Sequence, residues 1–157
     1  MRVRAHRPDP DIPFPAYATP GAVAFDLWAR EETIVESHAV GLIPANLIIE
    51  VPDGYALLVT LRSGIPRKKG LHMPHGIGVI DRDYCGEHDE VKIQVYNATD
   101  QPVTVERGER IAQGLLVQVG RVESWEETHT LGATRGGFGS TGTGAISTDG
   151  QAGGSAC

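Results

Sequence analysis

The sequence predicts an all-β fold, and three observations lead to this prediction. The 157-residue chain contains 20 glycines and 10 prolines, which is many turn formers for a helical protein. Its apolar stretches are short and recur about every 10 residues with turn residues between them, as in β-sandwiches and barrels. No stretch shows good helical periodicity, whereas one stretch alternates cleanly between apolar and polar side chains. A chain of this length fits one domain, so we expect a single all-β sandwich or barrel.

The first half of the chain supplies three strand-forming segments. Residues 22–28 are mostly apolar, and residues 42–51 form a second apolar stretch that Pro44 interrupts. Residues 55–61 read Tyr-Ala-Leu-Leu-Val-Thr-Leu, a composition rich in strand formers. After them, residues 63–69 predict one short helix with Ser63 as its N-cap.

The second half supplies three more strands. Residues 91–96 alternate, with Val91, Ile93 and Val95 on one face, which predicts a half-buried strand. Residues 103–105 and 111–119 predict two further strands. Turn residues separate the strands, at 53–54, 97–100 and 107–108.

Charge and cysteine content narrow the functional classes. The net charge of −6 argues against a general nucleic-acid binder, although a local basic pocket could still hold one polyanion. The two cysteines, Cys85 and Cys157, allow one bridge at most and provide no cysteine-based zinc site. No apolar run approaches the ~20 residues of a membrane span, and residues 1–6 precede no apolar core of a secretory signal. We therefore expect a cytoplasmic protein with no membrane partner.

The end of the chain differs in composition. Phe138 and Ile146 are the only large apolar residues after Leu131. The same segment contains nine glycines, at positions 132, 136, 137, 139, 142, 144, 150, 153 and 154. Such a segment buries too little apolar surface to offset the cost of ordering. Two interpretations stay open: a disordered tail, or a tail that orders over a ligand through its backbone N–H groups.

Four short segments carry candidate chemistry. Asp81 and Asp83 place two carboxylates two residues apart within 78–87, but an EF-hand would need oxygen ligands where Cys85 and Lys92 stand. Residues 62–64 offer an arginine, a serine hydroxyl and the backbone of a glycine, all of which can bind phosphate. The basic run 67–69 follows closely. Residues 108–113 lead into a strand. Residues 135–142 are rich in glycine but lack the Gly-Lys-Ser/Thr ending of a P-loop.

Read in order together with residues 22–27, these four segments resemble the five motifs of the homotrimeric dUTP diphosphatases. The resemblance rests on the order and spacing of residues 22–27, 62–64, 78–87, 108–113 and 136–142. It implies a jelly-roll β-barrel over residues 1–131 and a mobile C-terminal arm over 132–157. It also implies hydrolysis of dUTP to dUMP and pyrophosphate with Mg²⁺, in a homotrimer whose three sites draw on all three chains.

The resemblance also implies roles for individual residues. Asp81 corresponds to the base that orients and activates the attacking water, and Tyr84 to the ring that leaves no room for a 2′-hydroxyl. Asp26 corresponds to the aspartate that contacts the hydrated metal. Phosphate contacts are implied for Arg62, Ser63, Gly64 and Gln113. The base-reading hairpin includes His75 and Gly78, and the tail contributes Arg135, Phe138, Gly139, Ser140 and Thr141, with Phe138 stacking on uracil.

The chain departs from the family's pattern at four positions. Ala24 stands where glycine is usual, and Cys85 follows Tyr84 where arginine or glutamine is usual. His75 stands where many members carry asparagine. The tail arginine usually lies three residues before the Gly-Gly pair, a position that Ala133 occupies, whereas Arg135 directly precedes Gly136. We expect Arg135 to reach the γ-phosphate from this shifted position.

Two alternatives remain. The dCTP deaminase branch of the same fold typically carries a second serine where this chain has Gly64. Its catalytic glutamate lies three residues before an asparagine, and the corresponding residue before Asn97 is Gln94, which cannot relay a proton. The other alternative is a catalytically silent nucleotide-binding trimer, which pyrophosphate release from dUTP would distinguish.

Overall fold

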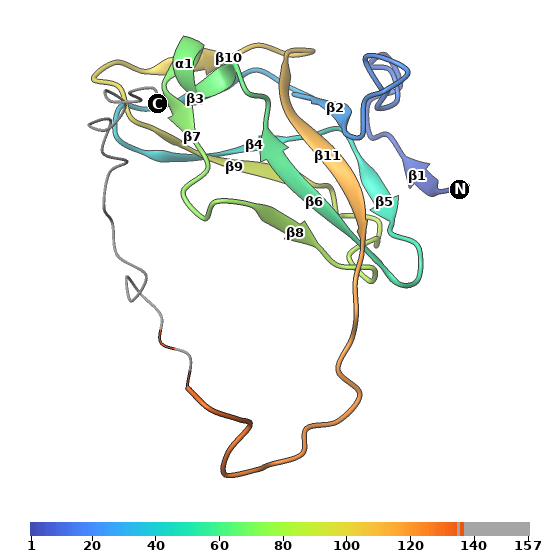
Figure 1. Ribbon diagram of the computed structural model, residues 1–157. Coiled ribbons are helices and arrows are strands. Elements are labelled where there is room, and N and C mark those ends of the chain that lie inside the picture. The colour runs from blue at the N-terminus through green and yellow to red at the C-terminus, as the bar shows by residue number, and fades with distance from the viewer. Residues whose placement is uncertain (135, 137–157) are drawn as a thin grey trace, which may run out of the picture. The chain divides into compact units, whose positions relative to one another are not determined.

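The computed structural model describes residues 1–134 and residue 136, and these residues form short strands with one short helix (Figure 1). The prediction of an all-β fold is confirmed. In chain order the elements are β1 (Arg4–His6), β2 (Phe25–Trp28), β3 (Thr33–Val35), β4 (Val40–Pro44), β5 (Ile48–Glu50), β6 (Tyr55–Leu61), α1 (Ile65–Lys69), β7 (Leu71–His72), β8 (Gly78–Ile80), β9 (Lys92–Asn97), β10 (Val103–Val105) and β11 (Arg110–Gln118).

The largest sheet has the strand order β2-β11-β6-β8, and its neighbouring strands are antiparallel. β11 and β6 form its centre and pair over seven residues, from Ala112 opposite Leu61 to Gln118 opposite Tyr55. β2 lies on the other side of β11 and places Asp26 opposite Gln113. The order brings segments from distant parts of the sequence into one sheet.

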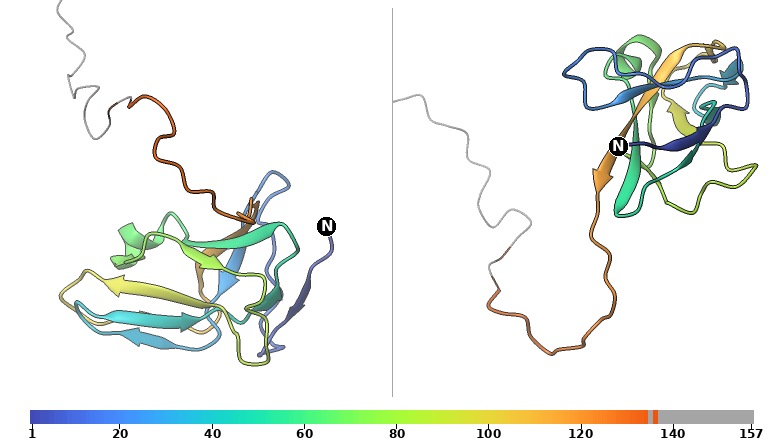
Figure 2. Two further views of the ribbon diagram at one scale, coloured as in Figure 1. Left: turned by 90° about the horizontal axis from the view of Figure 1, so that it is seen from below. Right: turned by 90° about the vertical axis from the view of Figure 1, so that its right-hand side faces the viewer.

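A second sheet has the order β4-β9-β7, and two further strand pairs, β1-β5 and β10-β3, complete the described strands. Figure 2 shows β6 and β8 in one layer and β4 and β9 in another. β9 pairs with β4 on one side and with β7 on the other. Stacked antiparallel sheets bury one face of each strand, which accounts for the alternation in the sequence.

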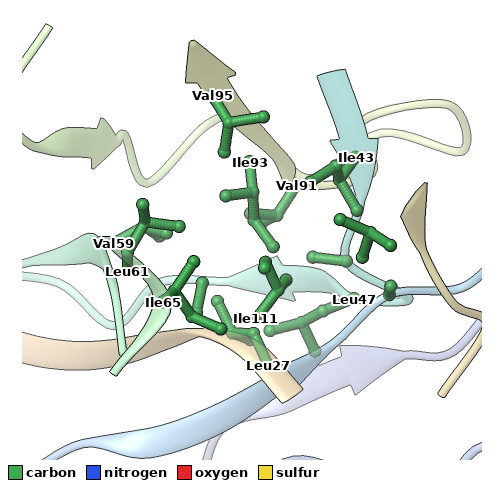
Figure 3. Close-up of a cluster of buried hydrophobic side chains, with 14 of the residues drawn as sticks. Leu27, Ile43, Leu47, Val59, Leu61, Ile65, Val91, Ile93, Val95 and Ile111 are labelled. Atoms are coloured by element: carbon green, nitrogen blue, oxygen red, sulfur yellow. The ribbon is translucent and has the colours of Figure 1, made fainter. Parts of the chain in front are cut away.

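The hydrophobic core lies between these layers (Figure 3). The predicted inward face of residues 91–96 is confirmed, because Ile93 and Val95 of β9 and the preceding Val91 are fully buried while Lys92 is exposed. The large sheet contributes Leu27, Leu57, Val59 and Ile111 to the same cluster, and the second sheet contributes Ile43 and Leu71.

The short helix was predicted correctly, but its predicted N-cap was wrong. α1 begins at Ile65, its N-cap is Gly64, and no side chain caps it. Pro66 suits the first turn because it lacks an N–H group that would need a partner there. Ile65 is buried and anchors the helix, and Gly70 ends it in the left-handed conformation. Ser63 therefore lies in the turn before the helix, without a capping role.

The apolar stretch 42–51 forms two strands rather than one. β4 ends at Pro44 and pairs with β9, whereas β5 begins at Ile48 and pairs with β1. Asn46 lies between them with a φ of 54° and is buried, and its side chain donates to the backbone oxygen of Asp9. The polar turn at Asn46 thus redirects the chain from one sheet to another.

The chain divides into two compact units, residues 1–121 and 122–157. All described strands and the helix belong to the first unit. In the second unit, the described residues 122–134 and 136 contain neither helix nor strand. The helix of the described part is far too short to cross a membrane. The predicted domain boundary between residues 131 and 132 stays a prediction.

Candidate active site

A polar hollow of about 400 Å³ lies where β6 ends, beside β2 and β11. We call it the Arg62 hollow. It brings together residues from three of the candidate segments and from α1. The residues that line it and bear on the chemistry are Asp26, Arg62, Ser63, Gly64, Arg67, Lys68 and Gln113.

The carboxylate of Asp26 is the fixed point of this hollow. Asp26 is buried, with 8% of its surface exposed, and contacts an arginine through each of its oxygens. Arg62 Nε lies 3.0 Å from Oδ1, and Arg110 Nη1 donates to Oδ2 at 3.2 Å. Two arginines compensate the buried negative charge and hold the carboxylate in one orientation.

Arg110 is a site residue that the sequence alone did not single out. Its guanidinium lies over the ring of Trp28, 5.6 Å from the ring centroid, while it donates to Asp26. Cation–π contact of this kind holds a guanidinium in place. The only available signal was its position within the 108–113 segment, since an exposed arginine at the start of a strand is common.

Strand pairing positions the other groups of the hollow. Gln113 lies opposite Asp26 across β11 and β2. The backbone N–H of Arg62 donates to Ile111 O at 3.2 Å, which ties the end of β6 to β11. Ser63 and Gly64 then form the turn into α1, closed by Ile65 N–H donating to Arg62 O at 2.9 Å. Guanidinium, amide and hydroxyl donors in one hollow can bind phosphate oxygens.

The loop after β8 carries Asp81 and Tyr84, both of which are exposed. The backbone N–H of Tyr84 donates to Asp81 O at 3.3 Å, which closes a turn between them. The Tyr84 hydroxyl donates to Glu90 O, also at 3.3 Å. This hydrogen bond holds the tyrosine ring near Glu90, where the loop ends before β9.

Glu90 anchors this loop to the barrel. Its buried carboxylate accepts hydrogen bonds from Arg30 Nε at 2.9 and 3.1 Å and from the backbone N–H of Asn46 at 2.9 Å. The hydrogen bond that Arg30 donates to Glu90 raises the pKa of Arg30 above its ordinary value. The backbone oxygen that holds the Tyr84 hydroxyl therefore belongs to a residue fixed by a half-buried ion pair.

The hairpin between β7 and β8 contains His75 and Gly78. Gly76 turns the chain with a φ of 78°, and its N–H donates to Met73 O at 3.1 Å. A Cβ atom at Gly78 would lie 3.3 Å from Val59 Cβ and 3.7 Å from His75 Nε2. Glycine at 78 therefore allows β8 to approach β6 closely, with the exposed histidine side chain nearby.

Within one chain, Asp81 and Arg62 lie at opposite ends of β6. Ile80 pairs with Leu57, so Asp81 follows at the level of Ala56, and both border a separate hollow of about 530 Å³. Arg62 is six residues further along, a separation of roughly 20 Å along a strand. The structure thus brings Asp26, Arg62, Ser63, Gly64 and Gln113 together but leaves Asp81 and Tyr84 apart from them.

The predicted tail residues Arg135, Phe138, Gly139, Ser140 and Thr141 lie outside the described residues, and so does the predicted flexibility of the tail. Their assignments stay predictions. Cys85 is exposed in the Asp81 loop as a free thiol, and Ala24 lines the Arg62 hollow.

Comparison with known sequences decides the family. A sequence model described as dUTPase matches residues 11–142 of this chain. The chain belongs to the dUTPase family. A deoxyuridine 5′-triphosphate nucleotidohydrolase of Dictyoglomus turgidum is 38% identical over 149 residues, covering 90% of this chain and 99% of that protein. One from Aquifex aeolicus is 44% identical over 115 residues, covering 72% and 75%.

Solved structures support the dUTPase fold. The crystal structure of a dUTPase from Streptococcus mutans matches with a TM-score of 0.70 and 31% identity, covering 76% of this chain and 98% of that one. The Staphylococcus bacteriophage 80alpha dUTPase with dUPNHPP matches with a TM-score of 0.76 over 90% of this chain and 99% of that one. At 22% identity, the phage protein supports the fold alone. The predicted family and fold are confirmed.

Proposed function

We propose that this dUTPase-family chain hydrolyses dUTP to dUMP and pyrophosphate, which keeps uracil out of DNA and supplies dUMP. The observation that carries the proposal is the Arg62 hollow, where Arg62, Ser63 and Gln113 surround the fixed Asp26 carboxylate. Such a set of donors suits a polyphosphate. Relatives that share 33–44% of their residues with this chain are named deoxyuridine 5′-triphosphate nucleotidohydrolase.

Asp81 is proposed to hold and deprotonate the attacking water. The water oxygen forms a bond to the α-phosphorus, and the bond from that phosphorus to the oxygen bridging the α- and β-phosphates breaks. The bonding electrons leave on this bridging oxygen as part of pyrophosphate, and the proton of the water passes to Asp81. Orienting the water within reach of phosphorus accounts for much of the rate acceleration by Asp81, because the entropy of bringing water and phosphorus together is lost before the reaction.

The neighbouring residues are proposed to select the nucleoside. The Tyr84 ring, held by its bond to Glu90 O, packs under the deoxyribose and excludes a 2′-hydroxyl. The backbone of the hairpin around His75 and Gly78 supplies donors and acceptors for uracil. Arg135, Phe138, Gly139, Ser140 and Thr141 are proposed to complete the site from the tail, with Phe138 stacked on the base and Arg135 on the γ-phosphate.

Mg²⁺ is proposed as the cofactor, held mainly by the triphosphate with Asp26 as an outer contact through water. Among residues 1–134 and 136, no three acidic, histidine or cysteine side chains gather into a metal site. Mg²⁺ in nucleotide sites usually keeps several of its waters and binds through phosphate oxygens. When bound, Mg²⁺ offsets phosphate charge that would repel the nucleophile. Asp26 is already oriented for this contact by Arg62 and Arg110.

We further propose a homotrimer with shared sites. Asp81 and Arg62 cannot meet within one chain, since they occupy opposite ends of β6. A neighbouring copy can bring its own Asp81 loop to the Arg62 hollow. With a nucleoside triphosphate as substrate, we propose the cytoplasm as its location, without a nucleic-acid or membrane partner.

Pyrophosphate release from dUTP, UTP, dCTP and dTTP, with and without Mg²⁺, tests the proposed activity. We expect D81N to lose nearly all turnover while a non-hydrolysable dUTP analogue still binds within a few-fold of the parent affinity. E87Q is the matched control, because Glu87 is an exposed carboxylate of the same loop without a hydrogen bond in the described part of the chain. Turnover in D81N within a few-fold of the parent would reject the assignment of Asp81.

The same assay separates the two alternatives. Ammonia release from dCTP would indicate a deaminase. Analogue binding without release of any product would indicate a silent nucleotide-binding trimer. The deaminase position, Gln94, pairs with Leu42 between β9 and β4, in a different sheet from the Arg62 hollow.

A further inference from the structure

The basic run of α1 divides into two parts with different surroundings. Lys69 is engaged: its Nζ lies 2.9 Å from Glu109 Oε2 and donates to Thr104 O at 2.7 Å. Arg67 and Lys68 are exposed and line the Arg62 hollow. Neither forms an ion pair or side-chain hydrogen bond with any residue of 1–134 or 136. The run therefore contains one cation used by the fold and two that face the hollow.

The Lys68 side chain runs back toward the phosphate-binding turn. Its backbone N–H donates to Gly64 O at 3.0 Å, which places it one helical turn after Gly64. A Cβ atom at Gly64 would lie 3.7 Å from Lys68 Cε and 3.8 Å from Cδ. The lysine stem therefore lies across Gly64, with its ammonium group beside the turn that contains Ser63.

The charges around the hollow do not balance. Asp26 is the one carboxylate among the described residues that line it, and Arg62 and Arg110 already contact both of its oxygens. Arg67 and Lys68 add two positive charges that have no acidic partner there. In a chain with a net charge of −6, this local excess matches a highly charged anion.

We propose that Lys68, assisted by Arg67, binds the β- and γ-phosphates of the substrate, an inference that rests on the proposed hydrolysis of dUTP. Arg62, fixed by Asp26, is rigid, whereas Lys68 is a mobile point charge with rotatable donors. A mobile cation can follow the departing pyrophosphate. Lys68 and Arg67 thus raise the affinity for a triphosphate more than the affinity for a monophosphate. The substrate dUTP is therefore retained and the product dUMP is released.

The test compares K68M with K69M. Both replace a lysine of the same helix by methionine, and Lys69 is directed to Glu109. Binding of inorganic tripolyphosphate and of dUMP is measured by calorimetry, and dUTP hydrolysis by steady-state kinetics. We expect K68M to weaken tripolyphosphate binding and raise the KM for dUTP roughly 10-fold each, the loss of one charge-assisted bond. dUMP binding should change less than twofold, and K68R should restore tripolyphosphate binding.

K69M should leave tripolyphosphate affinity within twofold of the parent, and circular dichroism with size-exclusion chromatography checks that both variants fold and assemble alike. Equal tripolyphosphate affinities in K68M and the parent, or equal losses in K68M and K69M, would overturn the proposal. The two proposals fail separately. A parent protein that binds tripolyphosphate through Lys68 but releases no pyrophosphate from dUTP retains the anion site and loses the proposed activity.

Discussion

Asp26 and Arg62 form an ion pair between β2 and the end of β6, with 3.0 Å between Asp26 Oδ1 and Arg62 Nε. The two residues are not on adjacent strands, because β11 lies between β2 and β6 in the sheet. The pair therefore spans β11 diagonally, because Asp26 lies opposite Gln113 while the backbone N–H of Arg62 donates to Ile111 O. It fixes the guanidinium of Arg62 by a carboxylate that is itself buried.

This pairing predicts a double effect for D26N. The amide carries no charge to compensate Arg62 and Arg110, so we expect kcat/KM for dUTP to fall by roughly 10- to 100-fold. The free energy of unfolding should fall by about 1–2 kcal/mol, less than for a fully buried pair, because both arginines can reach water. Steady-state kinetics and thermal unfolding measure the two effects. E31Q, which removes an exposed partner of Arg30, is the control and should change neither quantity appreciably.

Shared sites predict complementation between two inactive variants. D81N lacks the proposed base, and R62A lacks a phosphate ligand of the Arg62 hollow. If each site takes these residues from different subunits, random mixing at equal amounts should restore about one quarter of parental activity. Pyrophosphate release is measured after subunit exchange, with exchange verified by differently tagged chains. Inactive mixed trimers would show that one subunit supplies both residues.

The Tyr84 ring is expected to determine whether the site accepts deoxyribose or ribose. Removing the ring in Y84A opens space for a 2′-hydroxyl, so we expect the ratio of kcat/KM for UTP to that for dUTP to rise by roughly 10- to 100-fold. Y84F is the matched control, since it keeps the ring and loses only the hydrogen bond to Glu90 O. Parallel kinetics on both nucleotides give the ratio. An unchanged ratio in Y84A would assign sugar selection to other groups.

Much of the fold could be predicted because the order of apolar and polar residues in several strands reflects which face of the strand is buried. The alternation at 91–96 follows directly from one buried and one exposed face of β9. The segment 55–61 coincides with β6. β1 reads Arg-Ala-His and β3 reads Thr-Ile-Val, and both were missed because neither shows the apolar–polar–apolar order of the equally short β10. Ser63 was misassigned as a cap because residue type alone does not reveal where the first helical hydrogen bond forms.

The site could be predicted only in part, and for a physical reason. The resemblance identified Asp26, Arg62 and Gln113, which the sheet brings together. The role of Arg110 was hidden, because its contacts with Asp26 and Trp28 come from pairing between β2 and β11, strands far apart in the sequence. The separation of Asp81 from Arg62 likewise depends on the register of β8 against β6.

Gly114 provides a last prediction, about the strand pairing on which the site depends. It follows Gln113 on β11 and lies opposite Phe25 of β2. A Cβ atom there would lie 2.8 Å from Phe25 Cε2 and 3.0 Å from Leu57 Cδ1. Both side chains are buried in the core and have little room to move. The absence of a side chain at 114 therefore lets the phenylalanine ring cross β11.

We expect G114A to lower the free energy of unfolding by about 1–3 kcal/mol, the usual cost of overpacking a core. Phe25 precedes Asp26, so the displaced ring should also shift Asp26 from its place opposite Gln113 and reduce kcat/KM for dUTP. Denaturant unfolding and steady-state kinetics measure both effects. G120A is the control, because a Cβ atom at Gly120 would meet nothing within 4 Å. Equal stabilities of G114A and G120A would show that Phe25 and Leu57 relax freely, and the register of β2 on β11 would then need another cause.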